Sequence, residues 1–156
     1  MSTMRPALIL ALMLTACGGP FEPKAECRVE GFTVYGEGDL DCALVASRMA
    51  LAREVLVSRG LVPEEKFASV FGDVTIWAHD RDVFDSDAFG EYVPGSLEIQ
   101  VNRKLQGLVH EMLHRWDEFN HRPVQTPTTP EGRHVGWDSN GYDAASIAYH
   151  RECLRI

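Results

Sequence analysis

The sequence predicts an α+β fold with a small mixed or antiparallel sheet, a long N-terminal helix, and a later helix that carries the motif His-Glu-x-x-His. The first observation is the order of the predicted segments, which is strand, helices, strand, strand, helix, loop and helix. The second is the helical spacing of apolar residues over 40–59. The third is the strict alternation of apolar and polar residues over 97–101. Together they place a few strands beside helices of unequal length.

The first half of the domain contains two predicted strands and two predicted helices. Residues 28–35 are rich in β-formers and predict a strand. The long helix over 40–59 follows, with Asp39 as its expected cap. Residues 63–71 open with proline and two glutamates, which favours a short helix. Residues 73–78 predict the second strand.

The second half contains a strand, the motif helix and a closing helix. The alternation over 97–101 predicts a half-exposed strand at an edge of the sheet. Asn102 is the expected cap of a helix over 103–119. Residues 120–133 are too rich in proline and threonine for regular structure. A turn and a helix over 138–153 complete the domain.

The first residues have the features of an export signal. One basic residue, Arg5, precedes an apolar run over 7–16, which is about half of what a membrane-spanning helix needs. The run ends in Leu-Thr-Ala-Cys at 14–17, which resembles the lipobox of bacterial lipoproteins. That resemblance implies that Cys17 is acylated and begins the mature protein. The alternative is an ordinary signal peptide with a chance cysteine.

Three parts follow from the lipoprotein interpretation: a signal peptide over 1–16, a lipidated tether over 17–26, and one domain over 27–156. Removal of the first 16 of the 156 residues leaves 140, which suits a single domain. The resemblance implies attachment to the bacterial cell envelope through the N-terminal lipid. The residue after the cysteine is glycine rather than aspartate, which in Gram-negative bacteria implies the outer membrane.

The charge and the other cysteines narrow the choice of partners and of cross-links. The formal net charge of −8 argues against nucleic acid as a partner. Three further cysteines, Cys27, Cys42 and Cys153, are an odd number. A disulfide between Cys27 and Cys42 closes a short loop and is preferred, with Cys42–Cys153 as the competitor. None has the spacing of a zinc ribbon.

The motif helix brings chemistry to one of its faces. His110 and His114 are four residues apart, so their imidazoles lie one turn above each other. Glu111 lies about 100° around the helix from His110 and can address a water at the same point. An apolar stripe anchors the helix on another side, so the polar groups are held in place. The pattern predicts a zinc site with a general base.

At this motif the sequence resembles the zincin metallopeptidases, specifically over 108–116 and more loosely in the arrangement of helices and strands. No subfamily is assigned. The resemblance implies a peptide or protein as substrate, Zn²⁺ as cofactor and hydrolysis of the peptide bond. It also implies that the strand before the motif helix, here 97–101, pairs with the substrate backbone.

The third metal ligand is not fixed by the motif. The extended zincin pattern with a third histidine would need glycine at 117 and histidine at 120, and the sequence has Asp117 and Asn120. His134 is the preferred ligand, because the glycine-rich segment around it can return the chain to the helix. His121 and Glu131 are the alternatives.

Roles within the site follow from that assignment. Glu111 is the expected general base, and Tyr142 is the expected second donor to the developing oxyanion, with Tyr149 as the alternative. Asp117 and Asp138 are candidates for orienting the imidazoles. A different class of function also fits the sequence: a non-catalytic, lipid-anchored binding or structural protein in which zinc only joins the loop after residue 119 to the helix.

Overall fold

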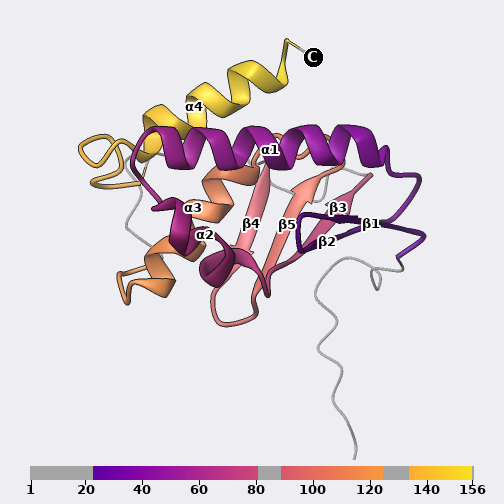
Figure 1. Cartoon of the computed structure of the whole chain (residues 1–156), viewed down its shortest axis with the longest axis horizontal. Coiled ribbons are helices and arrows are strands. Elements are labelled where there is room, and N and C mark those ends of the chain that lie inside the picture. Colours follow the sequence, from indigo (N-terminus) through magenta and orange to yellow (C-terminus); the bar gives the residue numbers. More distant parts are fainter. Residues whose placement is uncertain (1–22, 81–88, 125–133, 156) are drawn as a thin grey trace, which may run out of the picture.

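The structure is a computed structural model that describes residues 23–80, 89–124 and 134–155. The predicted signal peptide, Cys17 and the alternative ligand Glu131 lie outside the described residues. Over the described ranges the chain has an α+β fold with a five-stranded mixed sheet and four helices (Figure 1). The strands are β1 (Ala25–Val29), β2 (Phe32–Gly36), β3 (Thr75–His79), β4 (Gly90–Val93) and β5 (Glu98–Asn102); the helices are α1 (Cys42–Ser58), α2 (Glu64–Phe71), α3 (Leu108–Phe119) and α4 (Tyr142–Cys153).

The sheet has the strand order β1-β2-β3-β5-β4. Strands β2, β3 and β5 run parallel to one another, and the two outer strands, β1 and β4, are antiparallel to their neighbours. Alternate residues of the central strands, such as Val34, Ile76 and Ile99, are fully buried against the helices. Trp77 and Gln100, on the opposite face, are only partly buried. One face of the sheet therefore carries the core.

The first predicted strand is in fact a hairpin. Residues 28–35 contain a turn at Glu30 and Gly31, whose φ angles of 49° and 89° let β1 fold back onto β2. This turn was not predicted from the sequence because β-forming residues lie on both sides of it and Gly31 is the one residue in it that is typical of turns. Strand β1 begins at Ala25, so the folded domain starts two residues before the predicted boundary at 27.

The prediction that 97–101 forms an edge strand is wrong. The segment is a strand, β5, but it lies between β3 and β4 in the interior of the sheet. The edge next to the motif helix is β4 instead. The alternating pattern arose because one face of β5 is covered and the other is not, and it carried no information about lateral neighbours.

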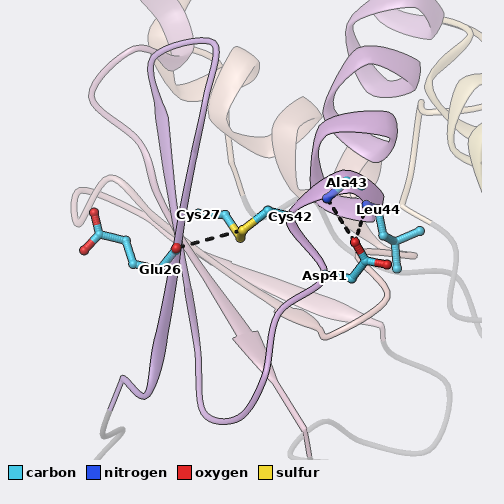
Figure 2. Close-up of a disulfide and its surroundings, with 6 residues drawn as sticks. All are labelled: Glu26, Cys27, Asp41, Cys42, Ala43 and Leu44. Atoms are coloured by element: carbon cyan, nitrogen blue, oxygen red, sulfur yellow. Dashed lines mark hydrogen bonds between the residues drawn. A yellow bond between two sulfur atoms is a disulfide. The ribbon is translucent and has the colours of Figure 1, made fainter.

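The helix boundaries also differ from the predicted ones. The motif helix begins at Leu108 rather than 103, because Asn102 ends β5 and its Oδ1 accepts from the backbone N–H of Gln106 (3.2 Å), closing a turn. Helix α1 is capped by Asp41 rather than Asp39, with Oδ1 accepting from the N–H groups of Ala43 and Leu44 at 3.0 and 3.1 Å (Figure 2).

The same end of α1 is joined covalently to the sheet. Cys27 of β1 and Cys42 of α1 form a disulfide with their Cα atoms 5.5 Å apart (Figure 2). This is the pairing that the sequence favoured. Cys153 near the end of α4 is buried and unpaired. None of the helices in the described part of the chain is long and apolar enough to cross a membrane.

Candidate metal centre

Three histidines converge at one point between α3 and the start of α4. His110 and His114 come from α3, and His134 comes from the segment that precedes α4. One nitrogen from each ring lies within 4.8 Å of the other two. The Nε2 atoms of His110 and His134 are 3.2 Å apart. The three side chains are therefore close enough to bind one metal ion, and the preferred third ligand from the sequence is among them.

The local backbone explains how the rings meet. On α3 the four-residue spacing puts the ring centroids of His110 and His114 5.0 Å apart. The ring of His134 reaches both, with centroid distances of 5.1 and 4.7 Å. No regular element carries His134. A turn in which the N–H of Trp137 donates to the carbonyl of His134 (3.2 Å) joins it to the residues before α4.

The outer hydrogen bond of a histidine ring determines which of its two nitrogens is free to bind a metal. The Nδ1 of His114 lies 2.9 Å from the carbonyl oxygen of Val124, which leaves Nε2 for a metal. A backbone carbonyl is a common outer partner of a metal-binding histidine, because it orients the ring and makes the other nitrogen more basic. The Nδ1 of His134 is buried and has no hydrogen-bond partner among the described residues. A hydrogen bond therefore orients the ring of His114, whereas Nδ1 of His134 has no such bond among the described residues.

Burial keeps two of the imidazoles neutral. It lowers the pKa of His110 to about 3, helped by repulsion from His114 and His134. It likewise lowers the pKa of His114 to about 4, with His134 adding to the effect. A neutral imidazole has a free lone pair, which is the form that binds a metal. Both rings are therefore available as ligands at neutral pH.

Glu111 lies on the same helix and faces the edge of the sheet. Its side chain is 4% exposed. A Cβ built on Gly90 of β4 would lie 2.9 Å from its Cγ and 3.1 Å from its Oε1, so only glycine allows this approach. Burial raises the pKa of Glu111 to about 8, against the opposing effect of a hydrogen bond from the backbone N–H of Tyr92. The edge strand thereby holds the carboxyl group in place.

A pocket of about 330 Å³ opens beside Glu111 and His110. It lies between the start of β4, the N-terminal turn of α3 and one face of α4. Phe89 and Ile147 are among its lining residues, and both are large apolar side chains that are exposed. Arg151 also lines it. An apolar pocket with a few convergent polar groups is the usual form of a small-ligand site.

The other predicted site residues lie elsewhere. His121 is exposed and is not part of the cluster. Tyr142 is buried, and its hydroxyl donates to Oδ1 of Asp117 at 2.8 Å. The hydroxyl of Tyr149 donates to the carbonyl of Leu105 at 2.7 Å. Both tyrosines are thus engaged in the core, and an oxyanion role for Tyr142 stays a prediction that requires its bond to Asp117 to be exchanged.

The two candidate orienting carboxylates do not contact the metal-site histidines through any hydrogen bond found in the described residues. Asp117 accepts from Tyr142, and the exposed Asp138 accepts from the N–H of Ser139 (2.8 Å). The orienting group for His114 is the carbonyl of Val124 instead. A backbone carbonyl leaves no mark in the sequence, so no residue pattern could have revealed it. The close approach of Gly90 to Glu111 was missed for a similar reason, since it depends on tertiary packing.

Comparison with known proteins adds no relative. No protein-family description, no curated protein and no solved structure matches the chain.

Proposed function

We propose that this protein is a zinc-dependent peptidase that hydrolyses a peptide bond, with Glu111 as general base. The observation that carries the proposal is the convergence of His110, His114 and His134 beside the buried Glu111, which lines a pocket together with His110. Three protein ligands with one open position is the arrangement of catalytic zinc sites. The resemblance of the motif to zincins supports the same reading.

The donor set fits zinc. Three imidazole nitrogens suit a borderline-soft divalent ion, although copper, nickel and iron accept the same ligands. Among the described residues, no carboxylate or thiolate belongs to the cluster, which argues against calcium and magnesium. A zinc ion held there would act as a Lewis acid toward the scissile carbonyl and make water more acidic, with its pKa falling toward ~7.

Glu111 would move the proton. Without a cation, burial keeps its pKa at about 8, so the carboxyl group is mostly protonated at neutral pH. A divalent cation among the neighbouring imidazoles would lower that pKa, because an opposite charge favours the carboxylate. The ionised Glu111 would then take a proton from the attacking water and hand it to the leaving amine.

The surroundings fit a peptide substrate. Strand β4 is an edge of the sheet next to Glu111, and an extended peptide can add to such an edge. The exposed apolar residues Phe89 and Ile147 line the adjoining pocket, and Val93 on β4 is also exposed. An extended segment with an apolar side chain would therefore have a place for both its backbone and that side chain.

A structural role for the metal is the second candidate. The cluster connects α3 with the segment before α4, and His114 also holds the carbonyl of Val124 after α3. A metal could thus serve only to join these segments. A fourth coordination position closed by protein would favour this role, and one that exchanges water beside Glu111 would favour the peptidase.

The deciding experiment measures zinc content and peptide hydrolysis in matched variants of the purified protein. His114→Ala should lose both zinc and activity. Glu111→Gln should keep zinc and lose about 10²–10⁴ in turnover, since it removes only the base. His121→Ala is the control and should change neither, because this histidine is exposed and outside the cluster. Unchanged hydrolysis by Glu111→Gln would exclude the mechanism.

The proposal extends to the protein's location. The lipobox-like residues over 14–17 favour attachment to the bacterial cell envelope through a lipid on Cys17. Replacing Cys17 by serine should move the protein from the membrane fraction to the soluble fraction and abolish labelling by a radioactive fatty acid. Persistent labelling of the Cys17→Ser variant would contradict this part of the proposal.

A further inference from the structure

The indole of Trp137 lies against all three histidines. Its ring centroid is 4.6 Å from that of His110, 4.7 Å from that of His114 and 4.4 Å from that of His134. Because these distances are nearly equal, the indole lies over the middle of the triangle formed by the three imidazoles. The side chain is 1% exposed. It therefore occupies one side of the triangle and excludes water from it.

Trp137 is itself held by the chain on both sides. Its N–H donates to the carbonyl of His134, and its carbonyl accepts from the N–H groups of Tyr142 and Asp143 at 3.0 and 3.2 Å. The ring of Tyr142 meets the indole edge-on, with centroids 5.2 Å apart and an interplanar angle of 78°. The indole is thus fixed to the start of α4, while the histidines it touches come from α3 and from the preceding segment.

Packing of this kind favours metal binding because it reduces the conformational entropy that the imidazoles lose when they become ligands. An unrestrained imidazole must give up rotamer freedom when it becomes a ligand, and a ring already packed in position gives up less. The outer nitrogen of His114, Nδ1, lies 2.9 Å from the carbonyl oxygen of Val124, which is an outer partner of the usual kind. The Nδ1 of His134 has none among the described residues. The shared aromatic contact is what restrains His134 instead.

We propose that Trp137 is a positioning residue for the metal site: its indole holds the three imidazoles together before a metal arrives and closes one side of the site. The open coordination positions must then lie on the other side, away from the indole. The inference rests on the proposed metal site and adds to it the group that prearranges the ligands. The buried Nε1 of the indole has no partner in the described part of the chain, so packing rather than hydrogen bonding carries the role.

The test compares variants at two buried tryptophans. Trp137→Leu removes the aromatic platform, and Trp137→Phe keeps a ring. Trp116→Leu is the matched control, because Trp116 is also buried and lies on α3 but stacks on Phe119 rather than on the histidines. Zinc affinity is measured by competition with a chelator, and the visible spectrum of bound Co²⁺ reports the coordination geometry. Unfolding of the metal-free variants measures the structural cost separately.

Trp137→Leu should weaken zinc affinity by about 10–100-fold, the range found for outer partners of metal ligands, and should alter the Co²⁺ spectrum. Trp137→Phe should recover most of the affinity. Trp116→Leu should lower stability and leave both the affinity and the spectrum as in the wild type. Wild-type affinity and an unchanged spectrum in Trp137→Leu would overturn the positioning role while leaving the proposed function intact. A wild-type protein that binds neither Zn²⁺ nor Co²⁺ would overturn the proposed function itself.

A second measurement covers the case in which Trp137→Leu does not fold. Cu²⁺ bound to the three histidines should quench the emission of an indole in contact with them. The quenching in the wild type should exceed that in Trp137→Phe, which keeps Trp77 and Trp116. Equal quenching in the two proteins, with Cu²⁺ bound to both, would show that Trp137 does not contact the site and would overturn the inference.

Discussion

The two ends of the sheet differ in the groups that they bury and in how these groups are held. At the β1 end, a disulfide joins Cys27 to Cys42, and apolar residues such as Val34 and Val45 fill the space between sheet and helix. At the β4 end, the helices bury His114, Glu111 and Asp117, all of which lose solvation on folding. The β1 end thus has a covalent cross-link, and the β4 end has buried polar groups whose desolvation costs free energy. The perturbed pKa values of the histidines and Glu111 are the mark of that second end.

The two ends of the sheet also differ in their exposed side chains. Near β1, exposed side chains form ion pairs, such as Arg28 with Glu26 and Arg53 with Glu30. Near the three histidines and Glu111, three large apolar side chains are exposed: Phe89, Val135 and Ile147. Grouped exposed apolar residues are a feature of binding surfaces. The two ends therefore differ in what they expose: ion pairs near β1, and large apolar side chains near the histidines.

The largest expected effect comes from removing the covalent link at the β1 end. Cys42→Ser opens a loop with a sequence separation of 15 and should lower the free energy of unfolding by about 3 kcal/mol. Zinc affinity should be unchanged at temperatures where the variant is folded, because the histidines lie at the other end. Urea unfolding and zinc titration measure the two quantities.

Cys153→Ala provides the control for the loss of a cysteine, since this thiol forms no disulfide. If Cys42→Ser lost zinc affinity as well as stability, the metal site would depend on the disulfide, contrary to this prediction.

A smaller effect should follow from adding one methyl group at each end. A Cβ at Gly90 would lie 2.7 Å from the carbonyl oxygen of Gln100 and 2.9 Å from Cγ of Glu111, so Gly90→Ala should displace Glu111. We expect a stability loss of about 1–3 kcal/mol, with zinc retained and peptide hydrolysis strongly reduced. Hydrolysis rates and zinc content, measured on the folded variant, test this expectation.

Gly31→Ala is the counterpart at the β1 end. It strains a turn with φ of 89° but meets no atom within 4 Å, so it should cost stability without changing hydrolysis. Equal loss of hydrolysis in the two glycine variants would show that Gly90 has no special relation to Glu111.

A gradual effect is the dependence of metal-free stability on pH, with a slope of up to about 1.4 kcal/mol per pH unit for each proton involved. Glu111 ionises above 4.5 when unfolded but only near 8 when folded, so the folded state holds the extra proton and stability falls as pH rises through that window. His110 and His114 take up protons below 6.5 when unfolded but resist until about 3 and 4 when folded, so stability also falls as pH drops below 6.5.

Stability should therefore be greatest near pH 6.5 for the metal-free protein. In Glu111→Gln the decline on the alkaline side should be reduced, whereas the acid decline should remain. Urea unfolding in the presence of a chelator, at pH values from 5 to 8, measures both limbs. An alkaline decline of the same size in wild type and Glu111→Gln would show that Glu111 is not its source.

The sequence predicted the parts of the site that are local. The helical spacing of His110 and His114 placed them on a shared face, and His134 was preferred as third ligand because the glycine-rich segment around it can return the chain to the helix. Hydrophobic periodicity also located α1 and α2 to within two residues. These features depend on spacing within one element or on the composition of one short segment.

What the sequence could not provide depends on contacts between distant segments. The alternation over 97–101 reports a covered face and says nothing about the strand beside it, so the edge was assigned to the wrong strand. Asn102 was predicted to cap the motif helix, and its side chain does accept a backbone hydrogen bond, but in a turn before the helix. The helix starts later because Leu105 adopts a φ of 55° and is buried in that turn. The contact of Trp137 with three histidines has no periodicity to reveal it.

The form of the β4 edge has a consequence for self-association. A free edge strand can template the growth of a sheet from one molecule to the next, which leads to aggregation. Strand β4 has only four residues, carries the exposed Glu91, and is followed at once by Pro94, which cannot donate to a ladder. Glu111 accepts the N–H of Tyr92 from the same strand. These features make the β4 edge a poor template for the growth of a sheet from one molecule to the next.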